Sequence, residues 1–224
     1  MKLRLTKVSH RVLRHFGDQK QLLIVCVHRD KDTPLLYTVH NGDIKGCKLL
    51  MDNGADSCVH NRANMTTTWQ AAYRGHVDLL RYVIFHGNPP LSVPSRGLVF
   101  EHAGPNPPFI FDVEHTPLYV AVQRKHFAVA ELLLDAGVMM WDEDWCWNSD
   151  LLTVMNHDLS QHSSLHSRLT KAMSEAPSLR HIVRHYIRRH FGQHILAVIP
   201  HLEIPNTLKD YLALQSLEKR QDLH

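Results

Sequence analysis

One spacing occurs three times in this chain of 224 residues and limits the folds that the chain can adopt. A threonine is followed nine residues later by a turn and, twelve residues after the turn, by a glycine; the copies begin at Thr33, Thr66 and Thr116. The first two copies start 33 residues apart. A unit of this length cannot bury its apolar faces alone, so neighbouring units must stack, and about three are needed for stability.

Each unit carries the signals of two short helices. Proline follows the opening threonine at Pro34 and Pro117, in the first helical turn, where no backbone N–H is missed. Glycines are expected to end the second helices in the left-handed conformation: Gly54, Gly87 and Gly137. The second unit departs from the pattern at residues 67–69, Thr-Thr-Trp, which predicts a less regular first helix there.

These units resemble the ankyrin repeat. The resemblance implies an all-α helical solenoid of three clear repeats with degenerate ends, occupying residues 32–159. Residues 1–31 match the repeat poorly and are expected to form an irregular cap or a degenerate repeat. Thr66 and Thr116 are 50 residues apart, so an insertion of about seventeen residues is expected near residues 89–114.

A second feature lies between Ser178 and Leu214. Five apolar residues fall at i, i+3, i+4, i+7 and i+8, on one stripe of a helix: Leu179, Ile182, Val183, Tyr186 and Ile187. Ser178 stands at the N-cap position and Gly192 where the helix would end. The opposite face, predicted to be solvated, carries four arginines: Arg180, Arg184, Arg188 and Arg189.

This C-terminal segment of about forty residues contains no cysteine that could staple it. A segment so small cannot bury an apolar stripe alone. The stripe must therefore pack either against the rest of the chain or against another protein.

Two motifs in this segment resemble the two parts of a SOCS box. Ser178-Leu179-x3-Val183-x3-Ile187 is similar to the elongin-binding box, with valine in place of the usual cysteine. Leu202-Glu203-Ile204-Pro205 is similar to the cullin box, with Glu203 where a proline usually stands. The resemblance implies that elongin C binds Leu179, Val183 and Ile187, and that the cullin contacts Leu202, Ile204 and Pro205. It also implies a small three-helix module at 176–214, after a connector at 160–175 and before a tail at 215–224.

Together the two resemblances point to the ankyrin-repeat and SOCS-box family. What they imply is a non-catalytic substrate receptor of an elongin B/C–cullin-5–RING ubiquitin ligase, which promotes ubiquitination and proteasomal degradation of a protein target. Two alternatives stay open. The chain could be an ankyrin scaffold or adaptor whose C-terminal helices cap the last repeat without recruiting a ligase, or it could bind elongins without the cullin.

The target-binding surface of such an array is expected on the hairpin ends and the inner-helix face, which together form a concave surface. Candidate contacts by position are Trp69, Tyr73, Arg74 and Tyr119, with Tyr37, His40 and the loop at 91–111 as further candidates.

Composition and motifs argue against other classes of function. The chain has no G-x-S-x-G, P-loop or H-E-x-x-H motif, so we expect no enzyme active site. The histidine pairs 162/166 and 181/185 have no nearby cysteine, and we expect neither a metal nor another cofactor.

A net charge of +3 is too small to imply nucleic acid binding, and the longest apolar run, Leu22–Val27, is too short for a membrane span or a secretory signal. Four cysteines without C-x-x-C spacing are expected to be reduced thiols in a cytoplasmic or nuclear protein.

Overall fold

A computed structural model describes residues 32–61, 63–94, 115–140, 143, 159 and 162–215. Every regular element within these ranges is a helix, and an isolated bridge pairs His60 with Thr66. The predicted cap at 1–31, most of the insertion near 89–114 and most of the tail at 215–224 lie outside the described residues.

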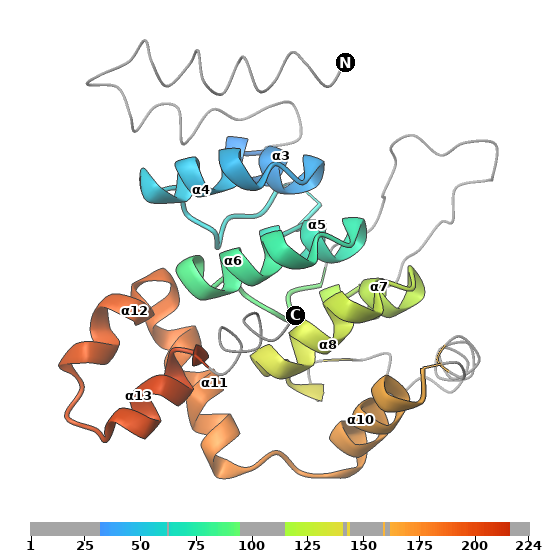
Figure 1. Cartoon of the computed structure of the whole chain (residues 1–224), viewed down its shortest axis with the longest axis vertical. Helices are drawn as coiled ribbons and strands as arrows, with labels where there is room; N and C mark the ends of the chain where they lie inside the picture. The colour runs from blue at the N-terminus through green and yellow to red at the C-terminus, as the bar shows by residue number, and fades with distance from the viewer. Residues whose placement is uncertain are drawn as a thin grey trace.

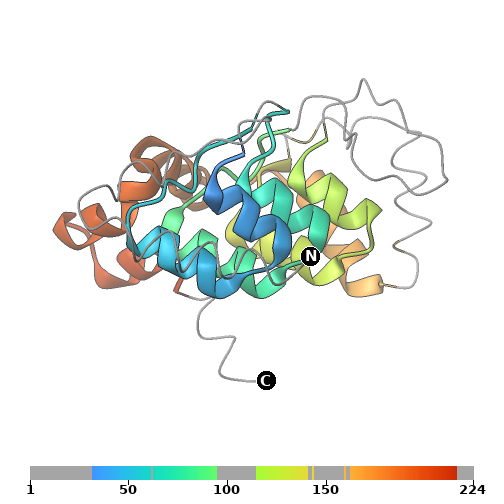
Figure 2. The ribbon, with the colours of Figure 1, turned by 90° about the horizontal axis from the view of Figure 1, so that it is seen from above.

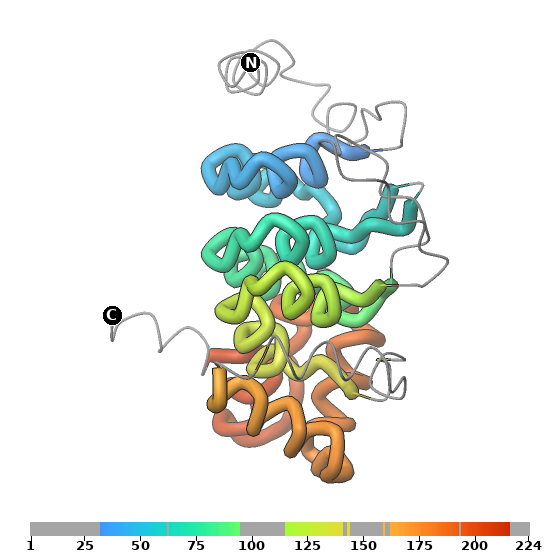
Figure 3. The backbone as a smooth tube through the Cα atoms, turned by 90° about the vertical axis from the view of Figure 1, so that its right-hand side faces the viewer, coloured from blue at the N-terminus to red at the C-terminus, as the bar shows by residue number. Residues whose placement is uncertain are grey.

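Three helix pairs stack on one another, as the repeat spacing predicted (Figure 1). The first helices, α3, α5 and α7, form one layer and the second helices, α4, α6 and α8, form the other, with the pairs in chain order along the stack (Figure 3). The pairs are α3 (Pro34–Asn41) with α4 (Ile44–Asp52), α5 (Thr67–Arg74) with α6 (Val77–Gly87), and α7 (Pro117–Gln123) with α8 (Phe127–Ala136). The core between them is mostly aliphatic, with Leu80, Leu118 and Leu133 completely buried. The predicted ankyrin-type solenoid is therefore confirmed.

Each first helix begins at the threonine that marks its repeat. The side-chain oxygens of Thr33, Thr66 and Thr116 accept hydrogen bonds of 3.3, 3.2 and 3.3 Å from the backbone N–H three residues later. Such caps satisfy donors that the helix itself leaves unpaired. The expectation of an irregular first helix in the second repeat was wrong, because Thr66 caps α5 and Thr67 Oγ1 donates to the Ser57 carbonyl at 2.8 Å.

The second helices do not all end in the predicted way. Gly54 and Gly137 take the left-handed conformation, with φ of +87° and +98°. Gly87 does not: it remains helical, and Asn88 takes the left-handed position with φ of +48°. Ser57 packs closely on Gly87 and donates to its carbonyl at 2.7 Å, and asparagine tolerates this conformation better than most residues. The shift by one residue gives the end of α6 a polar side chain.

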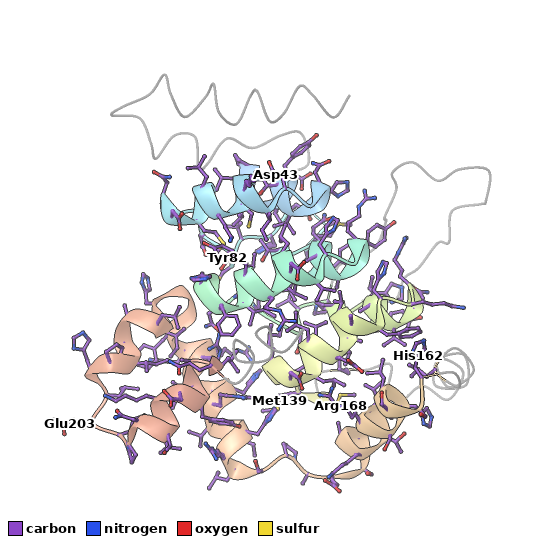
Figure 4. The ribbon with its side chains drawn as sticks, viewed as in Figure 1. Asp43, Tyr82, Met139, His162, Arg168 and Glu203 are labelled. Atoms are coloured by element: carbon purple, nitrogen blue, oxygen red, sulfur yellow. The ribbon has the colours of Figure 1, made fainter. Side chains whose placement is uncertain are left out.

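Helix α10 (Ser163–Ser174) extends the stack beyond the third repeat, within the segment predicted as a connector. Leu165 and Leu169 are buried in the same core as the repeats. Arg168 Nη2 lies 2.5 Å from Asp135 Oδ1 at the end of α8, and the His162 ring packs 3.8 Å from the Phe127 ring, centroid to centroid (Figure 4). The apolar face of the last repeat is thus partly covered by α10.

The C-terminal segment forms a small helical module beside α6 and α8 (Figures 1 and 2). Its long helix α11 (Leu179–Phe191) is followed by α12 (Ile195–Val198) between two 3-10 turns, η3 (Gly192–His194) and η4 (Ile199–His201), and by α13 (Asn206–Leu212). Three buried residues form its own core: Ile195, Ile199 and Leu212. The predicted three-helix module after the solenoid is confirmed.

Candidate functional site

The site that the sequence singles out is the long helix α11. Ser178 Oγ accepts a hydrogen bond of 3.3 Å from the His181 N–H at its start, as predicted. Gly192, with φ of +51°, follows its last residue. Both ends of the predicted helix therefore agree with the structure, and its two faces can be compared.

The apolar stripe of α11 is largely uncovered. Leu179 is 74% exposed, Tyr186 70%, Val183 44% and Ile182 36%, whereas Ile187 is half-buried against the module's own core. Among the described residues, six large apolar side chains are exposed, and four of them are these. Apolar surface gathered in this way usually marks an interaction site.

The opposite face of α11 was predicted to be solvated, and this was wrong for two of its four arginines. Arg184 and Arg188 are 6% and 7% exposed, and they face the solenoid. Arg188 donates hydrogen bonds from Nη1 to the Leu212 carbonyl at 2.7 Å and from Nη2 to the Ile84 carbonyl at 3.2 Å. A guanidinium has five donors in a fixed plane, so it can satisfy carbonyls of two different helices at once.

Asn88, at the end of α6, completes this junction from the array side. Its Nδ2 donates to the Arg188 carbonyl at 2.8 Å and to the Gly192 carbonyl at 2.7 Å. Burial and the neighbouring Arg184 charge lower the pKa of Arg188 to about 10, which leaves it charged at neutral pH. The array therefore holds the last turn of α11 through three hydrogen bonds, two donated by Asn88 and one donated by Arg188 to Ile84.

Two arginines of this face, Arg180 and Arg184, lie against Tyr211 of α13. The guanidinium carbons of Arg180 and Arg184 lie 4.1 and 4.4 Å from the centroid of its ring, the geometry of a cation–π contact. Arg184 also packs against Gly137 at the end of α8, where the helix dipole favours a cation. Arg180 and Arg189 are exposed. The side of α11 that carries Arg184 and Arg188 is thus the junction with the array, and the apolar stripe points away from it.

The residues assigned to cullin binding divide into two groups. Leu202 and Ile204 are half-buried against the module's core, whereas Pro205 is exposed. Glu203 is exposed at the outer edge of the module (Figure 4). The backbone is extended at Leu202, with ψ of 132°, before Pro205 precedes α13. The outward surface here includes Glu203, Pro205 and the exposed Leu208 of α13.

Of the four candidate target contacts, two are buried and two are not. Trp69 and Tyr119 are buried, so the expectation that they form a contact surface does not hold. Trp69 Nε1 donates to the His115 carbonyl at 2.9 Å, and the Tyr119 ring stacks on the His115 ring at 4.6 Å. These large rings fill the space between the second and third repeats, which periodicity does not reveal.

Tyr73 and Arg74 are the last two residues of α5; Tyr73 is half-buried and Arg74 is exposed. The structure adds Arg124, which was not predicted; its guanidinium carbon lies 3.6 Å from the Tyr73 ring centroid. A signal for it existed, because Arg124 stands eight residues after Thr116, as Arg74 stands eight residues after Thr66.

The described residues show no sign of other site chemistry. Among them, no group of three or more histidine, cysteine, aspartate or glutamate side chains could hold a metal ion. Within the described ranges, Cys47 and Cys58 form no disulfide, and burial raises the pKa of the Cys47 thiol to about 12, so that thiol is unreactive. None of the described helices has the length and apolar character needed to cross a bilayer.

Comparison with known families supports both modules. The SOCS box family matches residues 175–213, which include α11 to α13, and the ankyrin repeat family matches residues 114–142, the third repeat. No curated protein matches the chain. A SOCS box indicates recruitment to an elongin–cullin ligase, and ankyrin repeats indicate protein binding. The chain thus combines an ankyrin repeat with a C-terminal SOCS box, which is the arrangement of the ankyrin-repeat and SOCS-box family.

Proposed function

We propose that this protein is a non-catalytic substrate receptor of an elongin B/C–cullin-5–RING ubiquitin ligase. The solenoid binds a protein target, and α11 binds elongin C, which brings elongin B. The outward surface around Pro205 contacts cullin-5, whose RING subunit brings the charged ubiquitin-conjugating enzyme. The protein contributes proximity: it raises the effective concentration of target lysines near that enzyme, and ubiquitination leads to degradation of the target.

The observation that carries this proposal is the uncovered stripe of α11. Leu179 and Val183 are exposed while the arginine face of the same helix is fixed to the array, so the array cannot cover the stripe without breaking the junction. An amphipathic helix that offers apolar residues at i, i+4 and i+8 is suited to a groove on a partner. Burying three such side chains is worth roughly 1.5–3 kcal/mol each, before the cost of association.

A second function, that of an ankyrin scaffold without ligase recruitment, is favoured by one observation. Glu203 is exposed at the position where a cullin box usually has proline. Leu202 and Ile204 are half-buried against the module's own core. A scaffold of this kind would leave the cullin, or both the elongins and the cullin, unbound.

Co-expression with elongin B and elongin C distinguishes these functions. We expect the wild-type chain to co-purify with both elongins in a stable complex. Leu179→Asp places a charge in the proposed groove and should abolish co-purification, since an unpaired charge is expensive to bury. The matched control is Tyr37→Asp, which puts the same charge on an exposed apolar residue of α3 and should leave the complex intact. Elongin binding that survives in Leu179→Asp, or a wild-type chain that binds no elongin, would contradict the proposal.

A further inference from the structure

A cationic cluster on the array has no role in the contacts described so far. The guanidinium carbons of Arg124 and Arg74 lie 3.6 and 5.5 Å from the centroid of the same Tyr73 ring. Both arginines are exposed, at the C-terminal ends of α7 and α5, which are neighbours in the stack (Figure 1). We call these three residues the Tyr73 centre.

The Tyr73 centre is held in place by the core beneath it. The Tyr73 ring stacks on the Trp69 ring, with centroids 5.1 Å apart and planes inclined by 15°, and the Trp69 indole is fixed by its hydrogen bond to the His115 carbonyl. Arg74 bonds the Nε2 of His40, and His40 Nδ1 lies 3.1 Å from Gln70 Oε1. Because that oxygen only accepts, Nδ1 carries the proton and Nε2 accepts from Arg74. Side chains ordered in this way lose little entropy when they bind a ligand.

Within the part of the chain that the structure describes, the Tyr73 centre carries positive charge with no anion beside it. Among the described residues, no carboxylate lies within ion-pair distance of Arg74 or Arg124; the ion pairs found there are Arg168–Asp135 and Lys171–Glu175. The other exposed residues at these helix ends are also not acidic: Asn41, Gln123 and Lys125. Two cations near one ring repel each other, so an anion between them would be stabilised.

We infer that the Tyr73 centre binds a carboxylate side chain in an acidic segment of the protein target. A guanidinium recognises carboxylate in a planar, two-pronged geometry, and the tyrosine supplies apolar surface beside it. Two arginines suit one or two carboxylates and not a run of phosphates, which nucleic acid binding requires. This inference rests on the proposed role of the array in binding a target, but not on ligase recruitment.

Selection from a random peptide library displayed on phage, against the immobilised full-length chain, tests the inference. We expect the enriched peptides to be rich in aspartate and glutamate. An enriched peptide should lose about tenfold or more in affinity when its acidic residues are changed to amides, as expected for a hydrogen bond to a charged group. A third version, with phosphoserine in place of the acidic residues, separates recognition of carboxylate from recognition of phosphate.

The same peptide distinguishes the Tyr73 centre from the general charge of the surface. Arg124→Gln and Arg74→Gln should each weaken binding about tenfold, whereas Lys45→Gln, the same loss of charge at an exposed residue of α4, should change it less than twofold. Three results would overturn the inference. The selection could enrich no peptides, or peptides that are not acidic; the peptide could still bind the double arginine variant; or only the phosphoserine version could bind.

Elongin co-purification of these variants keeps the two proposals separate. Elongin binding should be unaffected by both arginine changes, because α11 lies on another part of the molecule (Figure 1). If the peptides bind and the elongins do not, the ligase proposal fails and the inference about the Tyr73 centre stands.

Discussion

Asn88 and Arg188 hold each other across the junction between the array and the SOCS box. Asn88 Nδ2 donates to the Arg188 carbonyl at 2.8 Å, and the Arg188 guanidinium donates back at 3.2 Å to the carbonyl of Ile84, one turn before Asn88 in α6. Both residues are buried. This reciprocal bonding fixes one face of α11 to the array and leaves the other face for a partner, so the junction also sets the direction in which the ligase would be held.

Removing the Asn88 side chain should loosen this junction. Asn88→Gly keeps a residue that readily adopts φ of +48° but removes the side-chain donor to the Arg188 and Gly192 carbonyls, which then keep only the backbone N–H groups of Gly192 and Ile195. We expect a loss of about 1–3 kcal/mol in the free energy of unfolding of the box, and faster amide hydrogen exchange in α11. Asn64→Gly is the control, because Asn64 is also left-handed, with φ of +58°, but its side chain donates to the Pro94 carbonyl. If the two changes alter amide hydrogen exchange in α11 equally, the Asn88 side chain does not hold α11 on the array.

Arg188→Lys should show that the guanidinium geometry matters in addition to the charge. A single ammonium is not expected to reach the carbonyls of Ile84 and Leu212 together, so one buried carbonyl is left unpaired, at about 1–3 kcal/mol. Chemical denaturation measures this loss. The exposed Arg189 provides the matched change, and Arg189→Lys should alter stability by less than about 0.5 kcal/mol.

Stability should fall in mild acid. Burial lowers the pKa values of His76, His115 and His181 below the usual 6.5, and the Arg184 charge lowers that of His181 further. The unfolded chain then binds more protons than the folded chain at and below pH 6.5, so the free energy of unfolding decreases as the pH falls through that value. Thermal melting between pH 7.5 and 5.5 measures the trend, and His181→Asn should make it shallower. A melting temperature that is flat or rises toward pH 5.5 would contradict this assignment.

Glu203 offers a test of the cullin contact. Glu203→Pro restores the residue that a cullin box usually has, and we expect tighter binding of cullin-5 to the complex with elongins, with elongin affinity unchanged. Glu203→Ala separates the loss of charge from the gain of proline. Surface plasmon resonance with immobilised cullin-5 measures both. If neither change alters a cullin affinity that is already strong, Glu203 is compatible with the contact and the elongin-only alternative is removed.

Much of the fold could be predicted because its signals are local. The threonine caps, the spacing of turns and the apolar stripe of α11 each depend on a few neighbouring residues, and they fix helix ends and phase. The left-handed residue after α6 was misplaced by one position, because glycine and asparagine follow each other at 87 and 88 and both accept that conformation. In the structure Ser57 of the preceding repeat packs against Gly87, a contact that the local sequence does not reveal.

The faces of the site could not be predicted in the same way. Periodicity shows which residues share a face of α11, but not which face meets the array. Arginine normally indicates solvent, yet Arg188 is buried because carbonyls of Ile84 and Leu212 are presented at the right distance by helices remote in sequence. The burial of Trp69 and the partnership of Arg124 with Tyr73 likewise depend on contacts between different repeats.

The central claim is that the outward face of α11 binds elongin C while the inward face stays on the array. Site-specific photocrosslinking tests it most directly, with p-benzoylphenylalanine placed at Tyr186 on the outward face or at His181, which is half-buried beside Gly137 on the array side of the helix. We expect a crosslink to elongin C from position 186 and none, or far less, from position 181. A crosslink from position 181 alone, or from neither position in a mixture with purified elongin B and elongin C, would contradict this claim.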